Sequence, residues 1–181
     1  MIIEEKQVST ERKFEGRVVS LRVDQARIGD GSLRSREVVE HPGGVSVVCL
    51  TEKNEVLMVR QFRYAPMEVL LELPAGKLER GEDPFEAMRR EQREETGTTA
   101  EQYVDLGVLY PTPAYDTERI YLWACRVTGY GAQELDDGEL LEVEKVPLEE
   151  LEAMVLSNRI RDAKTQIGIL KAAALVRAGA L

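Results

Sequence analysis

Three glutamates lie close together in an interval that has the features of a helix. Glu91 and Glu95 are four positions apart, and Glu94 is three positions after Glu91, so a helix would carry all three carboxylates on one side. Like charges at this spacing cost an isolated helix roughly 0.2–0.5 kcal/mol per pair. Hard divalent cations such as Mg²⁺ and Mn²⁺ prefer oxygen ligands of this kind. The spacing would suit a metal site, but the charges alone favour a solvated acidic helix face.

The helix that would position these carboxylates is predicted over Pro84–Thr96. Asp83 is a suitable N-cap, proline suits the first helical position, and Glu86 completes a capping box. Gly97 stands where a glycine commonly ends a helix.

The other sides of this helix carry different residue types. At roughly 100° per residue, Phe85, Met88 and Gln92 fall on the neighbouring face, which we expect to pack against a sheet. We expect the three arginines to point mostly away from the carboxylates, so that no cation lies among them. These arginines are Arg89, Arg90 and Arg93.

The remaining pattern predicts mixed strands with a few helices, that is, an α+β or α/β fold with a mostly non-local sheet. The first forty residues are predicted to form two or three strands, including Arg17–Ala26 and Leu33–Glu40, around a turn at Gly29–Gly31. Further strands are predicted at Val45–Leu50, Val56–Gln61, Val69–Leu73, Val104–Tyr110 and Ile120–Val127, and a short one after the acidic loop Glu134–Glu139. Two helices, at about Pro147–Ser157 and Asp162–Ala178, complete the predicted elements.

Bulk properties narrow the classes of function. A chain of 181 residues with 43% hydrophobic residues suits one compact domain, and a net charge of -9 argues against a duplex nucleic-acid binder. No apolar run approaches the ~20 residues that span a bilayer, and the charged N-terminal segment does not suit a signal peptide. Cys49 and Cys125 lie in apolar runs, which favours buried reduced thiols over a disulfide and predicts a cytoplasmic protein. With His41 as the single histidine, a zinc cage is not expected.

The interval Gly76–Thr98 resembles the Nudix box. Its fixed positions are a glycine, a glutamate after five residues, Arg-Glu after seven, Glu-Glu after two and a glycine after one, and here they are Gly76, Glu82, Arg90, Glu91, Glu94, Glu95 and Gly97. Gln92 and Thr98 stand where that family usually has aliphatic residues, which puts some of the packing behind the helix in doubt. The resemblance implies a Nudix fold, in which a mixed sheet lies between helices.

The resemblance also implies roles for individual residues. Glu91 and Glu95, with the carbonyl of Ala75, are expected to bind two or more Mg²⁺ or Mn²⁺ ions, and Glu94 is expected to be a further ligand or a support. Gly76 suits a place where backbone passes close to a metal or phosphate. In addition, Arg90 and Glu82 are expected to orient the helix and its loop by ion pairing, with a plain surface acid as the alternative for Glu82.

Residues beyond the box resemble the ADP-ribose pyrophosphatase branch of the family. LELPAGKLERGE at Leu71–Glu82 is similar to that branch, as is Pro113, sixteen positions after Gly97. The segments EVVEHPGGVSVV, QFRYAP, DTERIYLW and DAKT are also similar, so that the resemblance covers roughly Gly16–Ala172. It implies metal-dependent hydrolysis of ADP-ribose to AMP and ribose 5-phosphate.

The same resemblance suggests residues that bind substrate. Arg63 is expected to contact a phosphate. Arg36 and Glu118 are candidates for binding the adenosine end, Glu118 across a dimer interface, and Pro113 is a further substrate-binding candidate. Ordinary surface pairing is the alternative for Arg36 and Glu118.

A general base is expected from the acidic loop. ELDDGELLEV resembles a loop that brings a late glutamate to the metal centre, which indicates Glu139 as base or ligand and Asp137 as the second choice. A simply solvated loop is the alternative.

The expected organisation is a strand arm over residues 1–40, exchanged within a homodimer, followed by a Nudix domain over residues 41–181. Because the metal centre contacts only the diphosphate, GDP-mannose or ADP-glucose is an alternative substrate. A non-catalytic ADP-ribose sensor and an acidic scaffold without a ligand are the alternatives from other classes.

Overall fold

The structure is a computed structural model that describes residues 3–135, 138 and 140–181. The chain divides into two compact units. The arm unit comprises Met1–Gly43 and Tyr110–Arg119, and the core unit comprises Gly44–Leu109 and Ile120–Leu181. Within the described residues, no helix has the length and apolar character needed to cross a membrane.

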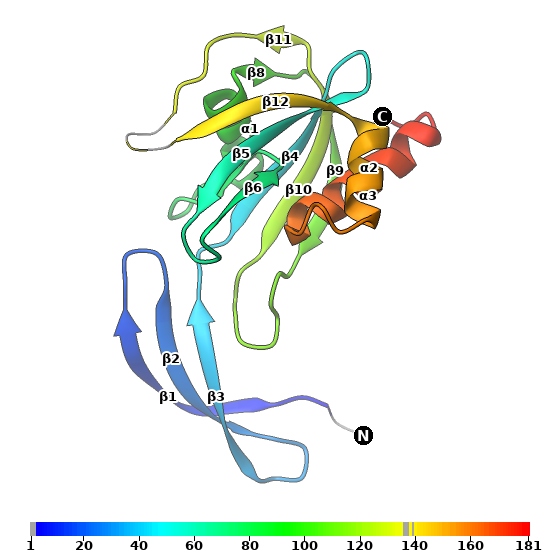
Figure 1. Cartoon of the computed structure of the whole chain (residues 1–181). Coiled ribbons are helices and arrows are strands. Elements are labelled where there is room, and N and C mark those ends of the chain that lie inside the picture. The colour runs from blue at the N-terminus through cyan, green and yellow to red at the C-terminus, as the bar shows by residue number, and fades with distance from the viewer. Residues whose placement is uncertain (1–2, 136–137, 139) are drawn as a thin grey trace. The chain divides into compact units, whose positions relative to one another are not determined.

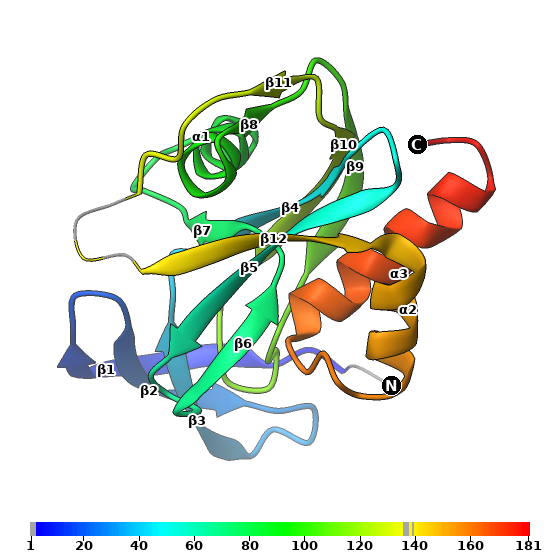
Figure 2. The same cartoon turned by 45° about the horizontal axis from the view of Figure 1, so that its top comes forward.

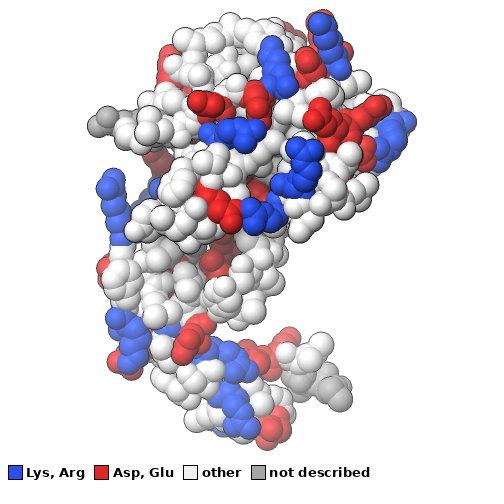
Figure 3. Space-filling view, viewed as in Figure 1, with Lys and Arg blue, Asp and Glu red and all other residues white. Residues whose placement is uncertain are grey.

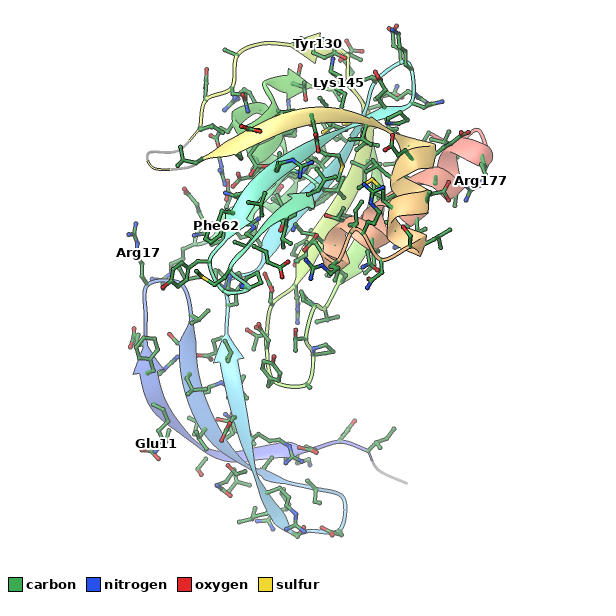
Figure 4. The ribbon with its side chains drawn as sticks, in the orientation of Figure 1. Glu11, Arg17, Phe62, Tyr130, Lys145 and Arg177 are labelled. Carbon is green, nitrogen blue, oxygen red and sulfur yellow. The ribbon has the colours of Figure 1, made fainter. Side chains whose placement is uncertain are left out.

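The arm unit is a three-stranded antiparallel sheet in the order β1-β2-β3, with strands at Lys6–Glu15, Ser20–Arg27 and Leu33–Glu40 (Figure 1). The segment 110–119 joins β3 through a bridge between Val39 and Asp116. All ten residues of β1 are exposed, and Glu11 projects from it into solvent (Figure 4). Because β1 buries neither face, its sequence has no period-two alternation of apolar residues, and such alternation is what normally indicates a strand.

The core unit contains a seven-stranded mixed sheet. Its main path is β12-β5-β4-β10-β9, with β6 beside β5 and β7 beside β4. Among the described strands of this sheet, β4 and β10 are the parallel pair, in a register that runs from Gly44 opposite Ile120 to Leu50 opposite Arg126. The strands are β4 (Gly44–Leu50), β5 (Glu55–Arg63), β6 (Glu68–Glu72), β7 (Ala75–Lys77), β9 (Tyr103–Leu109), β10 (Ile120–Arg126) and β12 (Leu141–Pro147), and the two-residue strands β8 (Thr98–Thr99) and β11 (Gly129–Tyr130) pair separately.

Helices cover both faces of this sheet. Figures 1 and 2 show α1 (Pro84–Thr96) on one side, and α2 (Leu148–Leu156) and α3 (Ala163–Arg177) on the other. Successive residues of β5 alternate between the two cores, because Val56 and Met58 pack with α2 and α3, whereas Leu57 packs with α1. The expected mixed sheet between helices is therefore confirmed.

Charges of both signs are interspersed on the face of the molecule seen in Figure 3, rather than segregated into patches. On this face, Lys and Arg do not gather into a basic patch of the kind that duplex nucleic-acid binding uses.

Candidate metal and phosphate site

The helix α1 begins and ends at the predicted residues. The Asp83 side chain accepts hydrogen bonds from the backbone N–H groups of Phe85 and Glu86, and Gly97 ends the helix at φ 65°. However, the Glu86 carboxylate lies 3.4 Å from the guanidinium of Arg89, where a capping box would direct it back to the N-cap.

The carboxylates of α1 face the short strand β7. Glu95 is 1% exposed, and its Oε2 accepts a hydrogen bond of 2.8 Å from the backbone N–H of Ala75. A Cβ added to Gly76 would lie 1.8 Å from Oε1 of Glu91, so the Glu91 carboxylate lies directly against this glycine. The structure thus brings together Ala75, Glu91 and Glu95, which are three of the four predicted ligand residues.

Gly76 does not have the positive φ that only glycine adopts easily. The reason for glycine at this position is the close approach of a carboxylate, not conformational freedom. A second glycine permits the same approach from behind, because a Cβ on Gly44 would lie 2.9 Å from the carbonyl oxygen of Gly76.

Arg90 does not point away from the carboxylates, and this part of the prediction is wrong. Its Nη1 lies 2.8 Å from Glu91 and 2.9 Å from Glu94. Its Nε and Nη2 bind Glu82 at 3.0 and 3.2 Å, so the expected ion pair with Glu82 is present. A helical period describes the direction of Cα–Cβ bonds, whereas a long arginine side chain can reach around to the next face.

The contacts of Arg90 keep the Glu82 carboxyl group ionised. The hydrogen bond from Arg90 lowers the pKa of Glu82, and the same contact, outweighing partial burial, raises the pKa of Arg90. Glu82 therefore anchors the loop before α1 as a charged group.

The residues at this site suit a hard divalent cation. Their potential donors are carboxylate oxygens and a backbone carbonyl, gathered on a capped helix and the adjoining strand. Within the described part of the chain, no group of three or more His, Cys, Asp or Glu side chains is arranged so that it could hold a metal ion by itself. Mg²⁺ keeps several waters and binds through one or two carboxylates together with substrate phosphates.

Arg63 lies at the end of β5 and is held by a residue that the sequence analysis missed. Glu72, which is 2% exposed, binds Arg63 at 2.6 Å through Nη2 and at 3.2 Å through Nε. Burial alone would lower the pKa of Arg63, but Glu72 outweighs it and the charges of Glu95 and Asp162 add to the effect, so that the pKa is raised. The guanidinium of Arg63 is thus permanently charged and lies within electrostatic range of Glu95. The Arg63 side chain is 38% exposed.

Comparison with known proteins decides the family. The sequence model of the NUDIX domain matches residues 40–167 of this chain. The chain belongs to the NUDIX domain family. The stretch 76–98, which resembles the Nudix box, lies within the matched residues.

Two similar proteins match more than nine-tenths of the chain, and a third matches a shorter part. It is 36% identical over 169 residues to the ADP-ribose pyrophosphatase of Bacillus subtilis, covering 92% of this chain and 91% of the relative. It is 38% identical over 172 residues to the methanol dehydrogenase activator of Bacillus methanolicus, covering 93% and 92%, and 33% identical to the GDP-mannose pyrophosphatase of Yersinia enterocolitica, covering 72% and 73%. A crystal structure of an ADP compounds hydrolase matches with a TM-score of 0.81 at 18% identity, covering 98% of this chain and 97% of that one, which supports the fold.

The two departures from the usual Nudix box contact each other. Gln92 is fully buried, and its side-chain amide donates to Oγ1 of Thr98 at 3.2 Å and accepts from the hydroxyl of Tyr103 at 2.9 Å. Thr96 completes the group, 2.7 Å from Thr98 between hydroxyl oxygens. A polar cluster therefore replaces aliphatic packing behind the Nudix helix, which resolves the doubt about Gln92.

The two cysteines lie beside this cluster. Both are buried and free, and they face each other in register on β4 and β10. Burial raises the pKa of Cys49 well above its ordinary value, so this thiol is protonated at neutral pH. The prediction of buried reduced thiols is confirmed.

The other predicted site residues belong to the arm unit or to undescribed positions. Within the arm unit, Arg36 binds Glu5 at 2.7 and 2.9 Å, and Glu118 lies 3.4 Å from His41. These contacts are of the kind considered as the alternative, and the binding of substrate by Arg36 and Glu118 stays a prediction. Pro113 is exposed in the segment 110–119. Glu139 and Asp137, the candidate bases, lie outside the described residues.

Proposed function

We propose that this chain is a metal-dependent ADP-ribose pyrophosphatase that hydrolyses the diphosphate bond of ADP-ribose to AMP and ribose 5-phosphate. The observation that carries the proposal is the placement of Glu91 and Glu95 against Ala75 and Gly76, within an intact Nudix box. The relative of 36% identity named ADP-ribose pyrophosphatase supports this choice of substrate.

Bound Mg²⁺ or Mn²⁺, in two or more ions, would supply an activated water and offset charge on the diphosphate. Glu91, Glu95 and the carbonyl of Ala75 would hold the ions. Arg63 orients a phosphate through its guanidinium fork. Arg90 fixes the directions of Glu91 and Glu94, while Glu82 holds Arg90 in place. Glu139, or else Asp137, accepts the proton of the attacking water in this proposal.

GDP-mannose is the second candidate substrate. Relatives named GDP-mannose pyrophosphatase are 30–33% identical to this chain, and the metal-binding residues do not distinguish one nucleoside from another. A panel of ADP-ribose, GDP-mannose, ADP-glucose and NADH with Mg²⁺ separates the candidates. We expect the highest kcat/KM on ADP-ribose with release of AMP, and a higher value on another compound would overturn this choice.

The role of the helix is tested with Glu95→Gln in the same assay. The amide oxygen of glutamine can still accept from Ala75, so the fold should be retained, whereas loss of the charged ligand should lower kcat by at least about a hundredfold. Glu86→Gln is the matched control, since Glu86 is an exposed glutamate on the same helix whose carboxylate pairs with Arg89. Near-normal turnover by Glu95→Gln would refute the proposed metal site.

The same proposal includes a homodimer formed through the arm unit, and a cytoplasmic location. The unit boundary between Gly43 and Gly44 supports the proposed division into an arm over residues 1–40 and a catalytic domain over residues 41–181, except that Tyr110–Arg119 belongs to the arm unit. Solvent-exposed apolar side chains on the arm, such as Val8 and Phe14, support a partner surface. The two free, buried thiols support a reducing compartment.

A further inference from the structure

The buried carboxylate of Glu72 is shared by two cations. Its Oε2 accepts from Nη2 of Arg63 at 2.6 Å and from Nζ of Lys164 at 2.9 Å. Lys164 comes from the first turn of α3 and is 8% exposed. Burial of a carboxylate is costly unless it is paired and hydrogen-bonded, and here both cations satisfy that requirement.

The start of α3 also holds the segment that leads to the Nudix box. Oγ1 of Thr165 accepts from the backbone N–H of Leu73 at 2.9 Å and donates to Asp162 at 2.6 Å. Asp162 in turn lies 3.0 Å from Nζ of Lys164. Burial would raise the pKa of Asp162, but Lys164 and Thr165 outweigh it and the pKa is lowered, so Asp162 is charged at neutral pH.

Contacts from other elements continue along the same segment. The carbonyl of Pro74 accepts from Oγ of Ser46 at 2.8 Å and from the N–H of Val47 at 3.1 Å, and Ala75 donates to Glu95. The four consecutive residues 72–75 are thus held by α3, β4 and α1 in turn. The DAKT segment, which the proposed chemistry does not use, supplies the contacts from α3.

The charges of the four ionised side chains around the Glu72 carboxylate, that carboxylate included, add up to zero. Arg63 and Lys164 carry two positive charges, and Glu72 and Asp162 carry two negative charges. Removal of Lys164 would leave Arg63 alone to compensate Glu72, with Asp162 uncompensated beside it. The guanidinium would then be drawn into the buried pair, and an approaching diphosphate would meet a net negative group.

We propose that Lys164 is a positioning residue for phosphate binding, which shares the Glu72 carboxylate and so leaves the Arg63 guanidinium available to substrate. This inference rests on the proposed role of Arg63. It assigns to α3, on the opposite face of the sheet from the Nudix helix, a part in the affinity for the diphosphate.

The first test compares Lys164→Met with the wild-type chain in steady-state hydrolysis of ADP-ribose. We expect KM to rise about tenfold while kcat changes less than about threefold, because Lys164 affects binding and not the reacting atoms. Lys171→Met is the matched control, because Lys171 lies on the same helix and donates to the carbonyl of Leu106, away from Glu72. Equal KM values for the two variants would overturn the proposal.

A double-mutant cycle separates positioning from general loss of structure. In an Arg63→Ala background, Lys164→Met should raise KM by less than about twofold, because its effect passes through Arg63. Adding Glu72→Gln to Lys164→Met restores the charge balance and should return KM to within about threefold of wild type. Additive losses in the Arg63→Ala background, or no rescue by Glu72→Gln, would assign Lys164 a purely structural role.

Calorimetric binding of inorganic pyrophosphate with Mg²⁺ provides a readout independent of turnover. Lys164→Met should bind it about tenfold more weakly than wild type does. Absence of hydrolysis by the wild-type chain on every sugar nucleotide would refute the proposed function, whereas unchanged pyrophosphate affinity in Lys164→Met would refute this inference.

Discussion

At the scale of single residues, Gly76 determines how closely the Glu91 carboxylate can approach the backbone. An alanine there would place its Cβ 1.8 Å from Oε1 of Glu91 and 2.4 Å from Oε2. The carboxylate is the far end of a flexible side chain, so it can move aside without a change in the fold. Gly76→Ala should therefore weaken metal activation about tenfold, which is the lower range for displaced metal-site groups, while the melting temperature changes little.

The measurement is the Mg²⁺ concentration that gives half-maximal hydrolysis, with thermal unfolding recorded in parallel. Gly131→Ala serves as the control, because a Cβ at that glycine would make an ordinary contact of 3.6 Å with the carbonyl of Gly97. If Gly76→Ala required no more Mg²⁺ than Gly131→Ala, the position of Glu91 against this glycine would be irrelevant to metal binding.

At the scale of elements, the Nudix helix packs on the sheet partly through a polar cluster. Gln92→Leu would leave the buried hydroxyl of Thr98 without its amide donor, and Thr98→Val would leave the Gln92 amide without that acceptor. A buried polar group left without a partner costs about 1–3 kcal/mol. Because Thr98 keeps its contact with Thr96 and Gln92 keeps its contact with Tyr103, each single variant should lower the free energy of unfolding by about 1 kcal/mol, the lower end of that range. The double variant creates an apolar pair, and we expect it to lose less than the sum of the two single losses.

Urea unfolding of the four proteins measures this coupling. Tyr103 is only partly buried, so we expect water to replace its bond to Gln92 in the variants. Additive losses in the double variant would show that Gln92 and Thr98 stabilise the helix independently, contrary to the contact seen in the structure.

The elements that the sequence predicts well are those with local determinants. Asp83 and Gly97 set the ends of α1 because capping depends on a few adjacent residues, and the buried strands β4 and β5 have continuous apolar runs. The first strand was not located because it is exposed on both faces. Pairing across long separations was also missed, since nothing in the sequence near Glu72 indicates that Lys164, 92 positions away, shares its carboxylate.

The same limit applies to the candidate site. Box spacing placed Glu91, Glu95 and Ala75 together correctly, because helix geometry and the family pattern both constrain them. The orientation of Arg90 was wrong, because spacing along a helix does not determine where a long side chain ends. The contacts that α3 supplies became visible only in three dimensions.

At the scale of the whole molecule, the arm unit lacks a core of its own. Apart from Gly43 at the unit boundary, the buried residues in the described part of the arm unit are Asp24 and Ala26. Apolar side chains such as Val8, Phe14 and Leu33 are exposed. A small sheet needs a buried hydrophobic face for stability. We expect a second copy of the chain to supply the cover, which is the basis of the proposed dimer.

Sedimentation equilibrium of the full chain should give twice the mass of 20.4 kDa. Phe14→Asp places a charge on the 56% exposed phenylalanine of β1, and because a buried unpaired charge is costly, it should shift the equilibrium to monomer at micromolar concentration. Leu156→Asp is the control, since Leu156 is a 79% exposed apolar residue at the end of α2 in the core unit and gains the same charge. A monomeric wild-type chain, or a Phe14→Asp variant that remains as dimeric as Leu156→Asp, would show that the arm does not form the interface.

The proposed contribution of Glu118 across the interface further requires that the monomeric variant have a higher KM for ADP-ribose than the Leu156→Asp control.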